Sequence, residues 1–313
     1  MTIACSVGIM AHNEGHNISR LFEALVSQRL SDVAMTEIIV VASGCTDDTE
    51  SIVRRWAVSE PRIRLVVQQH REGKASAVNR FLAQAREDIV VLCSADLLPE
   101  PDTIERIVLP FIDPEIGMTT ARPVPLNDPA QFFGFAAHMM WSLHHHINAT
   151  SFKAGELIAF RRVFQRIPYR TAVDEASVEP VIRGQGYTVQ YVPNAIVLNK
   201  GPETLEDFLC QRRRIYAGHL AIRDAIGYRV STLSGGKIAL LVLRHLDWRP
   251  REFLWTWAIA ALEAYGRFLG KLDYKRHRDH TVWELATTTK RLPVREGRAQ
   301  VAENASSGGS SAA

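Results

Sequence analysis

The chain has 313 residues, enough for one large domain or two modest ones, and its 46% apolar content is ample for a full hydrophobic core. Its 37 basic and 34 acidic residues leave a net charge of +3, which is too small to argue for nucleic acid, so we expect no nucleic-acid partner. Four scattered cysteines form no CxxC pair, which indicates reduced side chains in a reducing compartment.

The two ends of the chain carry further expectations. Residues 2–10 lack a basic leader, so we expect no signal peptide and a cytoplasmic location, including the inner face of the cell membrane. Residues 302–313 (AENASSGGSSAA) have almost nothing to bury, and the tail 293–313 is expected to be disordered.

The first part of the chain alternates strand-like and helix-like segments. The strand-like runs are short and nearly continuously apolar: 3–10, 37–42, 63–68 and 89–93. Such runs are typical of parallel strands buried on both faces. Segments with helical spacing lie between these strands. They are 17–28, then a second helix that Thr46 is expected to cap, and 75–85. This order predicts an α/β fold with right-handed crossovers and helices on both faces of a mostly parallel sheet.

A polar cluster follows each predicted strand, around Asn13, Ser43, Lys74 and Asp96. Because ligands of open α/β sheets bind beyond the carboxyl ends of the strands, we expect these clusters to share one site.

The chain after Asp96 is less regular. Helices are expected at 101–111, 128–148, 176–183 and 205–216, and strands at 188–192 and 195–198. From residue 235 onward the pattern changes to long, tryptophan-bearing helices.

Seven motifs stand in a recognisable order: GIMAHNE (8–14), VVASGCTDDT (40–49), GKASAVN (73–79), SAD (94–96), GELIAFRR (155–162), DEAS followed by GQGYTVQYVPNA (174–195), and QRRRI (211–215). Their order and spacing resemble the inverting family 2 glycosyltransferases, which have a GT-A, Rossmann-like, nucleotide-sugar-binding fold. The resemblance covers roughly residues 3–220 and points to a bacterial or archaeal type with a C-terminal helical extension.

By this resemblance, His12, Asn13 and Glu14 grip the base and ribose of a nucleoside-diphosphate sugar donor. Ser43 stands where the family has an acid that contacts the nucleoside, so uridine is not an automatic choice. Lys74 opens a helix whose N-terminus suits a diphosphate. An ordinary exposed lysine at a helix start is the alternative.

Asp96 resembles the last acid of the family's DxD motif, which binds Mg²⁺ or Mn²⁺ across the diphosphate, with Ser94 and Ala95 completing the motif. Hard cations prefer carboxylate and phosphate oxygens, and they neutralise a diphosphate leaving group. The alternatives are a simple aspartate turn after a strand and a weak metal site.

Glu175 aligns with the family's catalytic base, and its neighbour Asp174 is the second candidate. Two adjacent carboxylates repel each other, which can raise one pKa toward a useful value. The alternative is an acidic first turn stabilised by the helix dipole.

The acceptor side is expected to include Gly155 and Glu156 by resemblance, with Glu156 binding a hydroxyl. Gln211 and Arg214 resemble the family's QxxRW motif and share a helix face, where they can close over acceptor and diphosphate. Ile215 replaces the tryptophan, so processivity is not supported.

Several basic residues allow two interpretations. Arg212 and Arg213 fit a solvated helix face. The run 144–146 is three histidines that diverge by about 100° on a helix, so at most one is expected to face the cleft. His219 is a candidate for an extra metal or phosphate contact.

The C-terminal segment 253–271 predicts a helix with a narrow polar stripe at Thr256, Glu263, Arg267 and Lys271 and a broad apolar face. Its apolar stretches are too short to span a bilayer. It either packs on the catalytic domain, forms a homodimer interface, or makes peripheral contact with a membrane.

The sequence thus predicts a catalytic domain at 1–230, a helical extension at 231–292 and a tail at 293–313. The expected function is inverting, metal-assisted sugar transfer to an acceptor hydroxyl on a lipid carrier, a glycan or a small molecule. A catalytically weakened nucleotide-binding or scaffolding homologue is one alternative. A nucleotidyltransferase is another, although residues 8–14 lack the glycine- and arginine-rich triphosphate loop. No GxGxxG motif follows a strand, which disfavours a dehydrogenase.

Overall fold

A computed structural model describes residues 2–168, 174–228, 235–244, 246–278, 287–290 and 292. Its sheet has eight strands in the order β3-β2-β1-β4-β7-β6-β8-β5. In chain order they are β1 (Ile3–Ala11), β2 (Val33–Ser43), β3 (Ile63–Gln68), β4 (Ile89–Ser94), β5 (Leu98–Pro99), β6 (Ile116–Pro125), β7 (Ile158–Arg161) and β8 (Thr188–Asn199).

The first four strands are parallel to one another, as the sequence predicts. Strand β7 runs antiparallel to both β4 and β6, and β8 is parallel to β6. The continuous apolar runs of β1, β2 and β4 are buried on both faces. Strand β3 departs from that prediction because it lies at the sheet edge, where Val67 is exposed.

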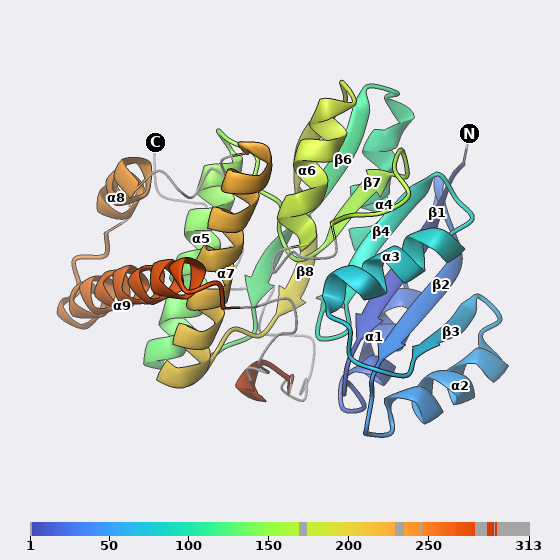
Figure 1. The fold of residues 1–313 in the computed structure, drawn as a ribbon, viewed down its shortest axis with the longest axis horizontal. Coiled ribbons are helices and arrows are strands. Elements are labelled where there is room, and N and C mark those ends of the chain that lie inside the picture. Colours follow the sequence, from blue (N-terminus) through green and yellow to red (C-terminus); the bar gives the residue numbers. More distant parts are fainter. Residues whose placement is uncertain are drawn as a thin grey trace.

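The helices, in chain order, are α1 (Ile18–Val26), α2 (Thr49–Ser59), α3 (Lys74–Gln84), α4 (Thr103–Val108), α5 (Phe132–Asn148), α6 (Asp174–Gly184), α7 (Leu205–Ile226), α8 (Gly235–Arg244) and α9 (Pro250–Lys275). Short 3₁₀ turns occupy Leu109–Ile112 and Thr287–Lys290. The helices α5, α7, α8 and α9 gather at one end of the molecule, away from β1–β3 (Figure 1).

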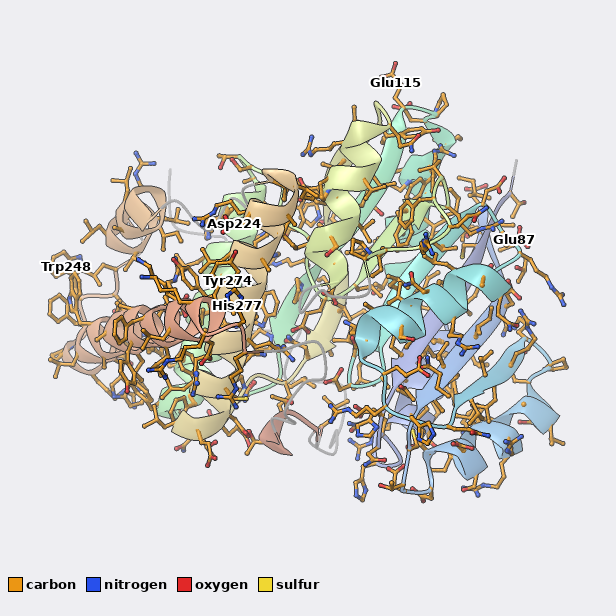
Figure 2. All side chains as sticks on the ribbon, in the orientation of Figure 1. Glu87, Glu115, Asp224, Trp248, Tyr274 and His277 are labelled. Atoms are coloured by element: carbon orange, nitrogen blue, oxygen red, sulfur yellow. The ribbon has the colours of Figure 1, made fainter. Side chains whose placement is uncertain are left out.

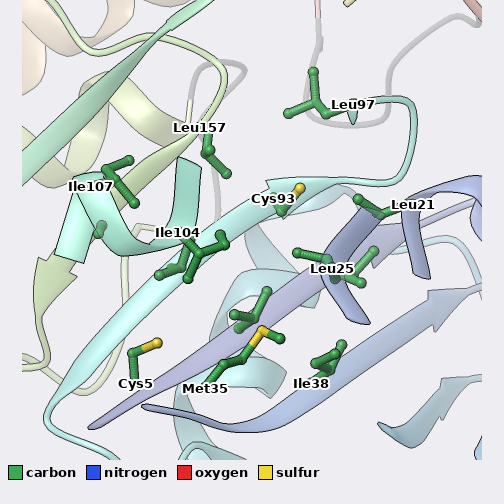
Figure 3. Close-up of a cluster of buried hydrophobic side chains, with 14 of the residues drawn as sticks. Cys5, Leu21, Leu25, Met35, Ile38, Cys93, Leu97, Ile104, Ile107 and Leu157 are labelled. Atoms are coloured by element: carbon green, nitrogen blue, oxygen red, sulfur yellow. The ribbon is translucent and has the colours of Figure 1, made fainter. Parts of the chain in front are cut away.

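Two hydrophobic clusters hold helices on opposite faces of the sheet. On one face Leu21 and Leu25 of α1 and Ile104 and Ile107 of α4 meet the buried side chains of the strands (Figure 3). On the other face α3, which carries Phe81, covers β1 and β2, and α6 covers β6, β7 and β8. A third cluster joins α5, α7 and α9. The predicted helices on both faces are therefore present.

The C-terminal part returns to the first helix. Leu292 is buried, its carbonyl accepts a hydrogen bond from Arg20 at 2.8 Å, and its N–H donates to Asn17 at 3.4 Å. Thr288 contacts Asp207 of α7 through its backbone N–H at 3.0 Å. The predicted boundary between 230 and 231 and the tail 293–313 fall outside the described residues.

Candidate active site

One cavity of about 350 Å³ lies beyond the carboxyl ends of β1, β2 and β4 and extends to α5 and α7. Its size suits a small-molecule ligand. Twelve of the fourteen site residues expected from the sequence line it: His12, Glu14, Ser43, Lys74, Ser94, Ala95, Asp96, Gly155, Glu156, Glu175, Gln211 and Arg214. The fold thus brings residues from seven separate motifs to one place.

The loops after β1 and β2 are tied together at the mouth of this cavity. His12 Nδ1 lies 2.7 Å from the carbonyl oxygen of Ser43, so Nδ1 carries the proton and donates it. The hydroxyl of Ser43 is buried without a hydrogen-bond partner among the described residues, and it faces the cavity as a donor for a ligand. Gly44 has φ +59°, and a Cβ there would lie 2.6 Å from the Arg71 backbone nitrogen. The close approach of the β2 loop to the loop after β3 therefore requires glycine.

Asn13 does not line the cavity, unlike its two neighbours. It has φ 54°, and its side chain bonds Thr46 twice, accepting from the backbone N–H at 2.8 Å and donating to the hydroxyl at 3.1 Å. The expectation that Thr46 caps α2 is wrong, because Asp48 occupies the N-cap position. Asp47 instead accepts from the Thr49 N–H at 3.0 Å and organises this turn. Asn13 therefore shapes the loop that presents His12.

Lys74 and Glu175 form an ion pair across the cavity. Lys74 begins α3, and its Nζ lies 2.5 Å from Oε1 of Glu175 in the first turn of α6. Both side chains are about four-fifths buried, at 16% and 20% exposure. The lysine is therefore not an ordinary exposed residue in this structure. The Asp174 side chain is outside the described part of the chain.

A second group of carboxylates lies around Asp96. Glu156 lines the same cavity, and burial together with repulsion from Asp96 raises its pKa to about 7. Asn199 donates to Glu156 Oε2 at 2.7 Å and fixes its orientation. Gly155 is held by its N–H, which donates to Thr120 Oγ1 at 2.8 Å. Burial and the neighbouring Asp96 carboxylate thus both disfavour the ionised form of Glu156.

This environment fits a divalent cation at Asp96. Among the described residues, no three His, Cys, Asp or Glu side chains converge to form a complete metal cage. Mg²⁺ and related ions are commonly held by one or two carboxylates, with substrate phosphates and water completing the shell. Asp96 offers such a carboxylate, and a cation there would relieve its repulsion with Glu156.

The α7 side of the cavity contains more charge than we expect from the sequence. Gln211 and Arg214 line it, as their shared helix face predicts, and Ile215 also reaches it. Arg212 was expected to fit a solvated face, and that is wrong: it is buried, lines the cavity and lies over the Phe208 ring at 5.9 Å. Arg213 is also partly buried, because its guanidinium forms a two-pronged pair with Asp273 of α9.

The histidines divide as their helical spacing predicts. His144 is buried and lines the cavity, with its pKa lowered to about 3 by desolvation. His145 contacts the Tyr191 hydroxyl at 2.7 Å, and His146 donates to the Ser142 carbonyl at 2.7 Å. His219 lines the cavity too, and burial lowers its pKa to about 3. Both cavity histidines are therefore neutral.

Sequence reasoning missed other residues of the cavity wall, among them Arg71, Lys153, Glu179, Asn199 and Thr289. Lys153 follows α5 in a loop with no motif, so only the three-dimensional structure places it in the site.

The model of the family described as "Glycosyl transferase family 2" matches residues 6–171, which is more than half of the chain. The chain belongs to glycosyltransferase family 2. The match includes β1 to β7 and the cavity residues from His12 to Glu156.

Two curated relatives of this family 2 glycosyltransferase are informative. A dolichol-phosphate mannosyltransferase of Mycosarcoma maydis is 28% identical over 49% of this chain and 63% of its own length. A poly-beta-1,6-N-acetyl-D-glucosamine synthase of Staphylococcus aureus is 26% identical over 66% of this chain and 52% of its own length. The chain thus spans between half and two-thirds of these relatives.

Solved structures match the fold. The mannosyltransferase PcManGT from Pyrobaculum calidifontis, in complex with GDP-Man and Mn²⁺, has a TM-score of 0.61 at 22% identity and covers 89% of this chain and 88% of its own. A glucosyl-3-phosphoglycerate synthase from Mycobacterium tuberculosis, with Mn²⁺ and UDP, has a TM-score of 0.51 at 22% identity over 70% of this chain and 79% of its own. The family 2 chain therefore has the GT-A fold, and the C-terminal helices α8 and α9 follow it.

Proposed function

We propose that this chain transfers a hexosyl group from a nucleoside-diphosphate sugar to an acceptor hydroxyl, with inversion at the anomeric carbon and with a divalent metal. The observation that carries the proposal is the cavity that Asp96, Lys74 and Glu175 all line, with the Lys74 ammonium paired to the Glu175 carboxylate. The nucleotide ligands named for the solved structures, GDP-Man and UDP, support a nucleotide sugar as substrate.

In this proposal the donor end of the cavity lies between the β1 and β2 loops and α3. His12, Glu14 and the free hydroxyl of Ser43 face the nucleoside. The N-terminus of α3 and Lys74 face the diphosphate, where backbone N–H groups and positive charge favour an anion. Asp96 would hold Mg²⁺ or Mn²⁺, which when bound neutralises charge that develops on the diphosphate.

Glu175 is the proposed base. The acceptor oxygen attacks the anomeric carbon, its proton passes to the Glu175 carboxylate, and the bond from that carbon to the diphosphate breaks. The nucleoside diphosphate leaves with the bonding electron pair, and attack from the opposite side inverts the anomeric configuration. Glu156, whose pKa lies near 7, is placed to bind a sugar or acceptor hydroxyl beside this centre.

The ion pair between Lys74 and Glu175 connects the donor and the base. A carboxylate held by an ammonium group is a poor proton acceptor, because the pair stabilises its charged form. A diphosphate competes for the same lysine, since phosphate oxygens are strong acceptors for a cation. Donor binding that draws Lys74 away would therefore release Glu175 for base catalysis.

The test measures nucleoside-diphosphate release from GDP-mannose and UDP-glucose, with Mn²⁺ or with a chelator. Asp96→Asn and Glu175→Gln are each expected to lower turnover by roughly 10² to 10⁴ while both variants stay folded at the assay temperature. Asp88→Asn and Glu115→Gln, at exposed acids, are the matched controls and should keep full activity. Full activity of Asp96→Asn or Glu175→Gln would contradict the role assigned to that residue.

The same assay separates the alternatives. Nucleotide binding without any donor turnover in the wild type would favour a non-catalytic homologue, for which the serines at 43 and 94 in place of acids are the motivating observation. The anomeric coupling constant of the product, measured by NMR, decides between inversion and retention.

A further inference from the structure

Lys153 is a partly buried cation. It lines the cavity, and its ammonium makes no hydrogen bond or ion pair with any described residue. Burial, with repulsion from Arg212 and Arg267, lowers its pKa to about 8. Removing a lysine from water without a partner is costly, so such residues are rare outside functional sites.

The charges around Lys153 leave this part of the cavity positive. Glu263 of α9 attracts the Lys153 ammonium. However, Arg267 at 2.8 Å and Arg212 at 3.9 Å already pair with that carboxylate. The Nε of Arg212 is buried and has no hydrogen-bond partner among the described residues. Arg267 and Arg212 thus already share this carboxylate, and an anion in the cavity would add negative charge beside Lys153.

His219 adds a neutral polar group to the same place. Its ring lines the cavity, and its charged form is disfavoured by burial and by Lys153 and Arg212. A neutral imidazole offers one N–H donor and does not add further repulsion. Lysine, arginine and imidazole together suit the several oxygens of a phosphate group.

This positive cluster is separate from the donor end. Lys153 lies in the loop between α5 and β7, and Arg212 and His219 lie on α7, whereas the donor end is formed by the loops after β1 and β2 and by α3. Lys153 also shortly precedes Gly155 and Glu156, which line the same cavity. The cluster is therefore placed on the side expected for the acceptor.

We propose that Lys153, Arg212 and His219 form a second anion site that binds a phosphate group of the acceptor, carried by a lipid or by a small phosphorylated molecule. The inference rests on the proposed function, because it takes the cavity to hold a donor at its other end. It restricts the acceptor to a phosphorylated compound.

The closing experiment titrates inorganic phosphate by calorimetry in the absence of donor. Binding is expected in the wild type and in Asp96→Asn, and at least tenfold weaker binding in Lys153→Met. Lys271→Met, which removes an exposed lysine, is the matched control and should bind like the wild type. Near pH 8.5 the wild type should take up a proton on binding, seen as a dependence of the heat on buffer ionisation. Equal binding by wild type and Lys153→Met would overturn the proposal.

Competition identifies the source of the phosphate. Displacement of inorganic phosphate by a short-chain polyprenyl phosphate indicates a lipid acceptor, and displacement by glycerol 3-phosphate indicates a small one. Displacement by neither would refute an acceptor site. Phosphate binding requires no turnover. The anion site can therefore be tested whether or not the wild type or Asp96→Asn shows transferase activity, so the two proposals can fail separately.

Helix α9 supports a second, independent inference, because it turns its polar side inward. The residues that face the protein repeat every three or four positions and are almost all polar or glycine: Glu252, Thr256, Ile259, Glu263, Gly266, Gly270 and Asp273. They meet arginines of α7, as Arg212 with Glu263 and Arg213 with Asp273. Apart from the contacts of Trp255, Ile259 and Leu262 with the third cluster, the buried side of α9 is thus polar, which is unusual for a helix that packs on a core.

The apolar side of α8 and α9 is exposed. Leu254, Trp257, Tyr265 and Phe268 of α9 are 47% to 66% exposed, and Leu240 and Leu243 of α8 are 53% and 54% exposed. Trp248, between these helices, is 79% exposed and projects at the outer end of the molecule (Figure 2). Exposed patches of this kind mark interaction sites.

The charged residues around the exposed apolar face of α8 and α9 indicate what kind of partner it binds. The acids Glu252 and Asp273 are buried and Glu263 is held in pairs, whereas Arg244, Arg249, Arg251, Lys271, Lys275, Arg276 and Arg278 are exposed. An apolar, tryptophan-bearing face with a basic border fits the surface of an anionic bilayer. No helix of the described residues has the length and apolarity to cross a membrane. We infer that α8 and α9 lie on an anionic lipid surface.

Co-sedimentation with vesicles tests this inference on the full chain. Binding to vesicles of phosphatidylcholine with a quarter phosphatidylglycerol should be strong, weaken with salt, and fall at least tenfold in the Trp257→Gln/Phe268→Gln double variant. Val58→Gln, at a valine 87% exposed on α2, is the control and should bind normally. A chain that stays in the supernatant, or a dimer by light scattering that the double variant dissociates, would overturn the membrane assignment.

Discussion

The ion pair between Arg213 and Asp273 is expected to hold α9 on α7. Both prongs of the Arg213 fork lie 2.9 Å from Asp273 oxygens, and the two side chains are 30% and 7% exposed. Breaking a fully buried pair by removing one partner costs about 3 to 5 kcal/mol. Because Arg213 reaches solvent and water can enter beside Asp273, we expect a smaller loss, about 2 kcal/mol, for Arg213→Met.

The assay is thermal unfolding followed by near-UV circular dichroism. For a protein of this size, about 2 kcal/mol corresponds to a midpoint lower by roughly 5 °C. Arg213→Lys keeps the charge but loses the fork, and its midpoint should fall between those of wild type and Arg213→Met.

The matched control is the pair of Arg29 with Asp102, which has the same forked geometry at 2.6 and 2.7 Å but a 70% exposed arginine. Arg29→Met should leave the midpoint nearly unchanged, because exposed pairs contribute little. Equal midpoints for Arg213→Met and Arg29→Met would refute the reasoning that α9 is docked through a buried charge.

Three further predictions concern stability. Gly270→Ala should destabilise the protein in a urea titration, because the new Cβ would lie 2.6 Å from the Arg213 carbonyl oxygen. This clash is expected to outweigh the preference of helices for alanine over glycine, which is about 1 kcal/mol. Gly184→Ala, where nothing lies within 4 Å of the new Cβ, should not destabilise the protein in the same titration. The Lys153 pKa is lowered from 10.5 to about 8, so between these pH values the unfolded state binds more protons and stability rises with pH. At pH 7 Lys153→Met should therefore have a higher unfolding midpoint than the wild type. A difference in midpoint that does not change with pH would contradict this. The His219 pKa is lowered from 6.5 to about 3, so stability is lost as the pH falls through this window; the loss should be smaller in His219→Gln, and an equal loss would exclude this cause.

The sequence predicts the donor half of the fold well because its strands are continuous apolar runs. The expected strand 3–10 is Ile3–Ala11, and the expected helix 75–85 is Lys74–Gln84. Strand β6 was not expected, since Ile116–Pro125 contains threonines, an arginine and two prolines instead of an apolar run. The expected strands 188–192 and 195–198 are one strand, β8, interrupted by an irregularity in its pairing with β6.

The site was predictable to the extent that motifs mark it. His12, Asp96 and Glu175 lie in motifs, and all line the cavity. Lys153 and the burial of Arg212 depend on α5, α7 and α9 meeting, which no local pattern reveals. Helical spacing likewise shows the polar stripe of α9, but the direction in which that stripe points depends on its arginine partners.

The return of the chain to α1 bears on how the enzyme is divided for study. A protein ended near residue 230, at the predicted domain boundary, would keep every motif of the family. It would lose Glu263 and Asp273 as partners of Arg212 and Arg213, Thr289 from the cavity wall, and Leu292 from the surface of α1. We therefore predict that the catalytic unit includes the C-terminal helices and that the shortest active chain extends to at least residue 292.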